Sequence, residues 1–249
     1  MKVLVTRPAD AAARTLAALT ERGHHGILSS VLDIVATDAA WPQGVVDAAL
    51  ATSANAFEHL RSDANWPLPE TRRLLPLYLV GEQTQHAARA RGFEGPAIVA
   101  LDAQDLATQI LAQANRPART LYLAGRERKS ELEDRLTAAE LNFDVLEVYD
   151  ARAAAELSED AIGLLHAGKC DAVLHYSRRS AEVFLKLAEA ADVNVAALLH
   201  VAISEDAATP LRKAGLARIA VAAEPKEQSL LDLLAAAAML PGNLGKAAL

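Results

Sequence analysis

Cysteine, aromatic residues and long apolar runs are scarce in this sequence of 249 residues. The single cysteine, Cys170, excludes an intrachain disulfide and a cysteine-rich metal site, and it fits a reducing compartment. It precedes an apolar run at 172–174, so we expect a small buried side chain rather than a reactive thiol. The sequence contains no stretch of about 18 apolar residues, so no transmembrane helix is expected. Residues 1–6 do not resemble a signal peptide. We therefore expect a globular protein of the cytoplasm.

Motifs for cofactors and covalent catalysis are also missing. The chain contains no P-loop, no dinucleotide fingerprint and no G-x-S-x-G nucleophile elbow. Its seven histidines show no metal-ligand spacing, and His175 lies within a predicted strand, where we expect it to pack in the core. Acidic residues outnumber basic residues by 32 to 25, and the net charge of −7 argues against nucleic acid as a partner.

The sequence does contain a regular alternation of short apolar runs, which predict strands, and helical patterns between them. This alternation is typical of an α/β fold, in which helices cover both faces of parallel sheets. Gly23, Gly92 and Gly215 follow three of the helices, where glycine supplies a left-handed cap. Strands are predicted at 3–6, 27–35, 48–51, 77–80, 97–100, 120–124, 143–151, 172–176, 200–203 and 219–222, and helices at 9–22, 55–61, 83–91, 103–114, 131–140, 179–190 and 207–214.

The chain repeats itself at an offset of about 124 residues. Residues 47–57 resemble residues 171–181, and residues 77–84 resemble both residues 121–128 and residues 200–207. The repeat therefore predicts that each half of the chain forms a related five-stranded unit. Two small sheets are favoured over one sheet of ten strands, because large twisted sheets tend to split.

Two predicted strands, 27–35 and 143–151, are about nine residues long, against a common length of five or six. We interpret them as the segments that cross between two lobes; the alternative is a strand followed by an irregular loop. The predicted lobes are a discontinuous one of residues 1–35 and 153–249 and a second of residues 36–152. The tail at 241–249 is expected to be disordered.

Small or hydroxyl-bearing residues stand at the carboxyl ends of most predicted strands. Ligands of parallel α/β sheets bind at these ends, where helix N-termini offer N–H groups to anions. Serine and threonine there are also ordinary helix caps, so one such loop alone indicates little. Six loops together favour an anion site. They lie at 6–8, 52–55, 81–84, 125–128, 177–180 and 204–206.

In order and spacing these segments resemble the uroporphyrinogen-III synthase family over nearly the whole chain, to about Leu240. The matching segments are VLVTRP at 3–8, ATSAN at 51–55, LVGEQT at 79–84, LYLAGR at 121–126, VLEVY at 145–149, VLHYS at 173–177, AIS at 202–204 and VAAEP at 221–225. The resemblance implies two flavodoxin-like parallel-sheet lobes joined by a two-strand connection. It also implies an enzyme of tetrapyrrole biosynthesis, the route to haem, sirohaem and cobalamin. The substrate would be hydroxymethylbilane, a linear tetrapyrrole with eight carboxylates. The enzyme would cyclise it to uroporphyrinogen III with inversion of ring D and loss of water.

The resemblance further implies site residues and partners. Tyr149 matches the family's tyrosine on the second connecting strand, and we hypothesise that its phenol donates a hydrogen bond to the leaving hydroxyl; the alternative is an aromatic that only packs. A monomer is implied, without cofactor, metal, nucleic-acid or membrane partner, and with the preceding pathway enzyme as a transient contact to consider. Arg179 is a further candidate cation. Substrate contacts are implied for Arg7, Thr52, Ser53, Ala54, Asn55, Gly81, Thr84, Gly125, Arg126, Ser177, Arg178 and Ser204.

Two other classes share part of this pattern. A bilobal binding protein without catalysis has the same anion-binding loops, but no effector domain is visible in the sequence. A nucleotide-sugar transferase of two parallel-sheet lobes generally has a much longer chain and a nucleotide fingerprint, which is missing. A decayed homologue has the same sequence pattern as a working synthase. We therefore favour the synthase and leave the non-catalytic relative open.

Overall fold

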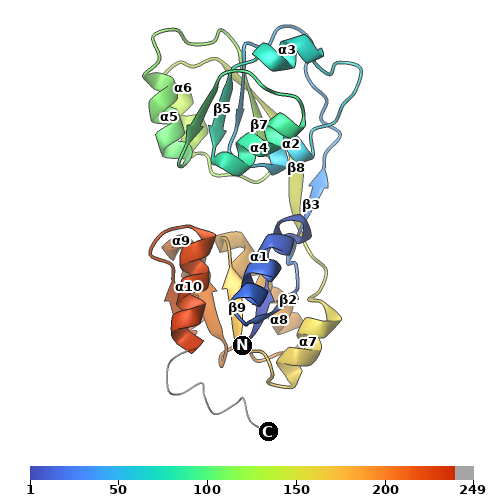
Figure 1. Cartoon of the computed structure of the whole chain (residues 1–249), viewed down its shortest axis with the longest axis vertical. Coiled ribbons are helices and arrows are strands. Elements are labelled where there is room, and N and C mark those ends of the chain that lie inside the picture. Colours follow the sequence, from blue (N-terminus) through green and yellow to red (C-terminus); the bar gives the residue numbers. More distant parts are fainter. Residues whose placement is uncertain (239–249) are drawn as a thin grey trace. The chain divides into compact units, whose positions relative to one another are not determined.

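The computed structural model describes residues 1–238, which form two compact units. The first unit comprises Met1–Asp33 and the residues from Arg152 onward, and the second comprises Ile34–Ala151. The chain therefore crosses between the units twice (Figure 1). Within residues 1–238 no helix has the length and apolar character needed to cross a membrane. The prediction of disorder at 241–249 falls outside the described residues.

The first unit is a five-stranded sheet of order β11-β10-β9-β1-β2, with parallel strand pairs. Numbered in chain order, this is the flavodoxin-like order 2-1-3-4-5. Its elements are β1 (Lys2–Val5), α1 (Ala9–Glu21), β2 (His25–Leu28), α7 (Glu159–His166), β9 (Ala172–His175), α8 (Arg178–Ala190), β10 (Leu199–Ala202), α9 (Glu205–Lys213), β11 (Ile219–Val221) and α10 (Glu227–Ala238).

The second unit is a sheet of order β3-β8-β7-β4-β5-β6, in which the strands from β8 to β6 pair in parallel. The short strand β3 lies at its edge beside β8. Its elements are β3 (Leu32–Ala36), β4 (Ala48–Ala51), α2 (Asn55–Glu58), α3 (Pro69–Leu74), β5 (Leu77–Val80), α4 (Glu82–Ala90), β6 (Ala97–Ala100), α5 (Ala103–Leu111), β7 (Thr120–Gly125), α6 (Glu131–Ala138) and β8 (Phe143–Ala153).

The internal repeat of the sequence is also a repeat of strand order. The repeated segments match β4 to β9 and β5 to β10. With these matches, the order β2-β1-β9-β10-β11 corresponds strand by strand to β8-β7-β4-β5-β6. The second unit is therefore the flavodoxin-like order entered at its third strand, which is a circular permutation. The predicted α/β fold of two flavodoxin-like sheets is confirmed.

Alternation of side chains along the strands explains why helices cover both faces. In the first unit Leu4 and Val173 pack with α7 and α8, whereas Val3 and Val5 pack with α1 and α10. In the second unit the odd-numbered residues of β4 and β7 pack with α2 and α4, and the even-numbered ones with α5 and α6 (Figure 1). Each central strand buries apolar side chains on both faces, as parallel sheets require.

The prediction of a single nine-residue strand at 27–35 is wrong. This segment forms β2 and β3, which belong to different sheets. Between them, the N–H groups of Ser29 and Val31 donate to the carbonyls of Val5 and Thr6, at 3.0 and 3.2 Å. The hydroxyl of Ser30 donates to the carbonyl of Leu32 at 2.8 Å. The bond of the Ser30 side chain to the neighbouring backbone is of the local kind that competes with a strand ladder. The long strand predicted at 143–151 is confirmed as β8.

Several smaller predictions are confirmed. Gly23, Gly92 and Gly215 have φ values of 73°, 79° and 73°, the left-handed conformation expected after a helix. Cys170 is buried, and burial raises the pKa of its thiol to about 11, which makes it unreactive. His175 is fully buried in the core of the first unit.

Candidate functional site

A pocket of about 360 Å³ lies at the carboxyl-end side of the second unit's sheet. Thr52 and Ser53 follow β4, Tyr122 stands in β7 and Tyr149 stands in β8. Parallel strands bring their carboxyl ends to one edge of a sheet, so residues far apart in the sequence meet there. The structure thus brings three predicted site residues, Thr52, Ser53 and Tyr149, to one pocket. The other lining residues are Ala103, Glu127, Arg128, Lys129, Glu131 and Leu132.

Two phenols line this pocket together with two hydroxyl-bearing residues that follow β4. Thr52 Oγ1 lies 3.3 Å from Tyr122 Oη, and Ser53 lines the same pocket as Tyr149. Burial raises the pKa of both phenols, and the interactions with Thr52 and Ser53 offset part of that rise. A phenol with a raised pKa keeps its proton at neutral pH. Both tyrosines are therefore hydrogen-bond donors at the pocket.

The ring of Tyr149 packs directly against Gly125, a predicted site residue at the end of β7. The register between β7 and β8 shifts between Ala124 and Gly125, so that Gly125 pairs with Tyr149. A Cβ atom at position 125 would lie 2.7 to 2.9 Å from three atoms of the Tyr149 side chain, closer than real contacts allow. The N–H of Arg126 donates to the carbonyl of Tyr149 at 2.8 Å. Glycine is therefore required for this approach, and the register shift directs the tyrosine.

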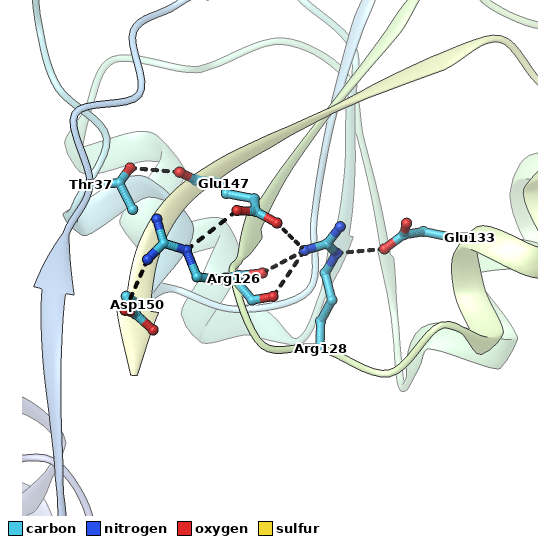
Figure 2. Close-up of polar contacts among 7 residues, drawn as sticks. Thr37, Arg126, Arg128, Glu133, Glu147 and Asp150 are labelled. Carbon is cyan, nitrogen blue, oxygen red and sulfur yellow. Dashed lines mark hydrogen bonds and ion pairs between the residues drawn. The ribbon is translucent and has the colours of Figure 1, made fainter. Parts of the chain in front are cut away.

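Arg126, which was predicted to contact substrate, lies in a cluster of ion pairs beside the pocket (Figure 2). Its Nε lies 3.5 Å from Glu147 Oε2, and its Nη1 lies 3.3 Å from Asp150 Oδ2. Glu147 Oε1 lies 2.9 Å from Nη1 of Arg128, and Glu133 on α6 accepts from Arg128 Nε at 2.5 Å. The bonds to Glu133 and Glu147 raise the pKa of Arg128. The carboxylates of Glu133, Glu147 and Asp150 thus outnumber the two arginines in this network at the end of β7.

The other predicted residues of the second unit begin helices. Ala54 is the N-cap of α2, and Asn55 is the first residue of that helix. Gly81 is the N-cap of α4 and has a φ of 76°, a left-handed conformation that suits glycine. Neither helix has a side-chain hydrogen bond at its N-cap. Thr84 is buried in the first turn of α4. These four residues lie outside the lining of the pocket that contains Tyr149.

In the first unit, the predicted serines are helix caps. Ser177 Oγ accepts from the N–H of Ser180 at 3.0 Å, and the Ser180 hydroxyl accepts from the N–H of Ser177 at 3.1 Å. This reciprocal pair is a capping box at the start of α8. Ser204 Oγ accepts from the N–H of Ala207 at 3.3 Å at the start of α9. Both hydroxyls therefore stabilise helix ends in this structure.

Arg7, at the end of β1, is held in a half-buried cluster. Its Nη1 lies 2.9 Å from Glu227 Oε1 and donates to Thr15 Oγ1 at 3.0 Å. Its guanidinium lies over the ring of Tyr176, 4.4 Å from the ring centroid. The Tyr176 hydroxyl donates to Glu227 at 3.2 Å, and burial raises the pKa of that phenol to about 12. This cluster joins the ends of β1 and β9 to α1 and α10.

Arg178 is the third predicted arginine with carboxylate partners. Its Nε lies 3.4 Å from Glu182 and its Nη1 lies 3.6 Å from Asp206. Like Arg7 and Arg126, it is already paired with acidic side chains. An anionic ligand has to compete with these carboxylates for each arginine.

Tyr122 and Arg128 line the pocket but are absent from the predicted site. A signal existed for Arg128, because it stands in the strand-end segment 125–128. None existed for Tyr122, because an aromatic residue within an apolar run indicates packing. Within residues 1–238 no group of three or more histidine, cysteine or acidic side chains is arranged to hold a metal ion.

Comparison with known proteins places the chain in a family. The family model for uroporphyrinogen-III synthase HemD matches residues 13–232. The solved uroporphyrinogen-III synthetase of Helicobacter pylori is similar, with a TM-score of 0.67 and 18% identity over 95% of this chain and 99% of that chain. A mutant uroporphyrinogen III synthase of Thermus thermophilus is also similar, with a TM-score of 0.57 and 18% identity over 95% and 98%. A search of curated proteins finds no match. The two structures support the fold, and the family model spans most of the sequence, so the chain belongs to the uroporphyrinogen-III synthase family.

Proposed function

We propose that this chain carries out the family's reaction with Tyr149 as the group that assists departure of the substrate's hydroxyl. The reaction is the cyclisation of hydroxymethylbilane to uroporphyrinogen III, with inversion of ring D and loss of water. The observation that carries the proposal is the pocket of the second unit. The partly buried phenol of Tyr149 lines this pocket with Ser53, a second phenol and the hydroxyl of Thr52.

The chemistry of the reaction demands positioning more than reactive groups. Loss of the hydroxyl leaves an electrophilic azafulvene, and the substituted carbon of ring D attacks it to give a spiro intermediate. That intermediate fragments and closes again in the inverted sense. The unassisted substrate closes without inversion, so the enzyme has to hold one conformer. Tyr149 donates a hydrogen bond to the hydroxyl and stabilises it as it leaves. The hydroxyl departs as water, and the pyrrole nitrogen of the same ring gives up one proton on becoming the azafulvene, so the step loses one molecule of water in all.

The electrostatics of the chain constrain how the substrate binds. A protein with a net charge of −7 does not attract an octa-anion through its overall field, so local donors have to do so. We propose that the hydroxyls of Thr52 and Ser53 and the N–H groups at the starts of α4, α8 and α9 bind carboxylates. Arg7, Arg126 and Arg178 contribute where a carboxylate of the substrate displaces an acidic partner.

The state of the protein in the cell is part of the same proposal. The chain acts on a small molecule as a monomer in the cytoplasm, with at most a transient contact to the preceding enzyme of the pathway. Absence of cysteine pairing fits a reducing compartment. Sedimentation of the purified protein tests the monomer.

A coupled assay tests the function. Hydroxymethylbilane is generated in place, the protein is added, and the oxidised products are separated by isomer. We expect the type III isomer to dominate, and Tyr149→Phe to lower kcat on the order of 100-fold or more. Tyr78→Phe is the matched control, since it removes a phenol hydroxyl that bonds Gln113 at 3.2 Å in the same unit, outside the pocket. It should keep full activity.

Two outcomes contradict the proposal at different levels. Full turnover by Tyr149→Phe removes the catalytic role of that phenol and leaves the synthase intact. Type I isomer alone, formed at the spontaneous rate by demonstrably folded wild-type protein, removes the enzymatic claim. A non-catalytic protein that binds polyanions is then the better interpretation.

A further inference from the structure

Arg128 makes four polar contacts with the backbone and the carboxylates around it. Its Nη1 donates to the carbonyls of Gly125 and Arg126, both at 3.1 Å, and to Glu147 Oε1 at 2.9 Å (Figure 2). Its Nε donates to Glu133 Oε1 at 2.5 Å. The side chain is 22% exposed. These acceptors come from the end of β7, from β8 and from α6, so one guanidinium ties three elements together.

The two carbonyls that Arg128 binds belong to the residues that hold Tyr149. Gly125 lies against the tyrosine ring, and the N–H of Arg126 donates to the tyrosine carbonyl at 2.8 Å. The register shift between β7 and β8 occurs at the same place. Such an irregularity interrupts the ladder, and the guanidinium of Arg128 donates to the backbone carbonyls there.

We propose that Arg128 is a positioning residue, which holds the 125–126 loop and thereby fixes the phenol of Tyr149 at the pocket. The proposal rests on the proposed role of Tyr149. Arginine suits the task because its planar fork donates several hydrogen bonds in fixed directions, which the flexible ammonium of lysine does not. Glu147 strengthens the frame, since its two carboxylate oxygens lie 2.9 Å from Arg128 and 3.5 Å from Arg126.

A direct contact between Arg128 and a carboxylate of the substrate is the competing role. Arg128 does line the pocket. However, Glu133 and Glu147 already balance its charge at 2.5 and 2.9 Å, so a third carboxylate meets no net attraction there. The two roles differ in kinetics. Loss of positioning lowers kcat, whereas loss of a binding contact raises KM and reduces its dependence on salt.

The same pair of strands contains a matched control. Arg119 precedes β7, and its Nε donates to Asp144 Oδ2 at 2.7 Å. Its Nη1 donates to the carbonyls of Gln43 and Val45, at 3.1 and 3.4 Å. It therefore ties β7 to β8 through a carboxylate and binds two carbonyls, as Arg128 does, but at the amino ends of the strands. Arg119→Lys removes comparable bonds far along the strands from Tyr149.

The experiment compares Arg128→Lys with Arg119→Lys. Steady-state kinetics are measured in the coupled assay, and the ring ¹³Cζ resonances of the four tyrosines are recorded, with Tyr149→Phe for assignment. We expect Arg128→Lys to lower kcat on the order of 10- to 100-fold with little change in KM, and to shift the Tyr149 resonance. Arg119→Lys should lower the thermal stability of the protein about as much as Arg128→Lys does. Its kcat and the Tyr149 resonance should stay unchanged.

A double variant shows whether Arg128 acts through Tyr149. Arg128→Lys combined with Tyr149→Phe should be no slower than Tyr149→Phe alone, because residues that act as one unit are not additive. If Arg128→Lys does not fold, Glu133→Gln loosens one of the four contacts, and a smaller loss of kcat with the same resonance shift is expected.

Two results overturn the inference. One is a folded Arg128→Lys variant with unchanged kcat and an unchanged Tyr149 resonance. The other is a rise in KM at constant kcat, which assigns Arg128 to substrate binding. Failure of the proposed function is distinguishable from both. If Tyr149→Phe is fully active, the catalytic role is lost, but the resonance shift still reports whether Arg128 fixes the ring.

Discussion

The two units share one strand order but use the ends of their strands differently. In the first unit, the hydroxyls of Ser177 and Ser204 cap α8 and α9. In the second unit Ser53, the counterpart of Ser177, accepts from the N–H of Asn55 at the start of α2, at 3.3 Å, and also lines the pocket with Tyr149. The serine of the second unit therefore stands both at a helix start and at a pocket. Strand order brings these residues to one edge of the sheet, and the side chains of neighbouring strands, such as Tyr149, decide whether a strand end also lines a pocket.

The cores of the two sheets also differ at equivalent positions. His175 and His200 stand where the repeat has Ala51 and Leu77 in the second unit, and all four are buried. His175 Nε2 lies 3.1 Å from His200 Nδ1, and the two rings stack with centroids 5.3 Å apart. The first unit thus contains a buried pair of titratable rings where the second is apolar. Its response to acid should differ accordingly.

The largest effect is expected from Gly125→Ala, which disrupts the close contact between residue 125 and the ring of Tyr149 in the second unit. The added Cβ would lie 2.7 Å from the Tyr149 side chain, so the ring has to move away from its place at the pocket. A displacement near 1 Å costs on the order of 100-fold in kcat. The coupled assay measures this loss. A kcat close to that of the wild type would show that the ring position does not matter.

A second prediction tests the difference between the cores by pH. Burial lowers the pKa of His175 well below its ordinary value of 6.5, and burial also lowers that of His200. In the unfolded chain both histidines have the ordinary pKa. Below about pH 6.5 the unfolded chain therefore binds protons that the folded state does not bind. The free energy of unfolding of the first unit should therefore fall as the pH falls below that value. Hydrogen exchange followed by peptide should locate the loss in β9 and β10.

The control for this prediction exchanges the pair for the residues of the second unit. His175→Ala with His200→Leu should remove most of the acid dependence between pH 7.5 and 5.5, whatever its cost in absolute stability. His24, whose pKa burial also lowers, accounts for the rest. An unchanged dependence would assign the acid sensitivity to other groups.

A third prediction separates capping from substrate binding at Ser177. Ser177→Ala should lower the free energy of unfolding by about 1 kcal/mol, because the N-cap of α8 is lost. Ser177→Asp should keep the cap but raise KM, since a negative charge then faces the carboxylates proposed to bind at this helix start. Chemical denaturation and steady-state kinetics give the two readouts. An unaltered KM in Ser177→Asp would remove this helix start from the substrate site.

The smallest effect is expected in the middle of α7, at Gly163. A Cβ atom at Gly163 meets no atom within 4 Å, and glycine inside a helix is less favourable than alanine. Gly163→Ala should therefore raise the free energy of unfolding by about 0.5–1 kcal/mol and leave kcat unchanged. It is the counterpart of Gly125→Ala, with the same chemical change and the opposite expected result. Thermal unfolding measures the gain.

Local patterns were enough to predict most elements but not all. The apolar runs predicted the strands because each central strand is buried on both faces. Helices α3, α7 and α10 escaped prediction for physical reasons. In α3 no residue is buried, α7 contains Gly163, and the alanine run of α10 blurs the alternation of polar and apolar residues. The break between β2 and β3 escaped because it depends on serine hydrogen bonds to the chain around it.

By itself, the sequence determined the two parallel sheets, their repeat and the position of the small residues after each strand. These follow from periodicity, glycine and proximity along the chain, which are local properties. Only the tertiary structure decided which partners those residues meet. Arg7 pairs with Glu227, 220 positions away, and Tyr149 meets Gly125 through a register shift. Such contacts depend on strand order and register, which place distant residues at one edge of a sheet, and no local pattern contains that information.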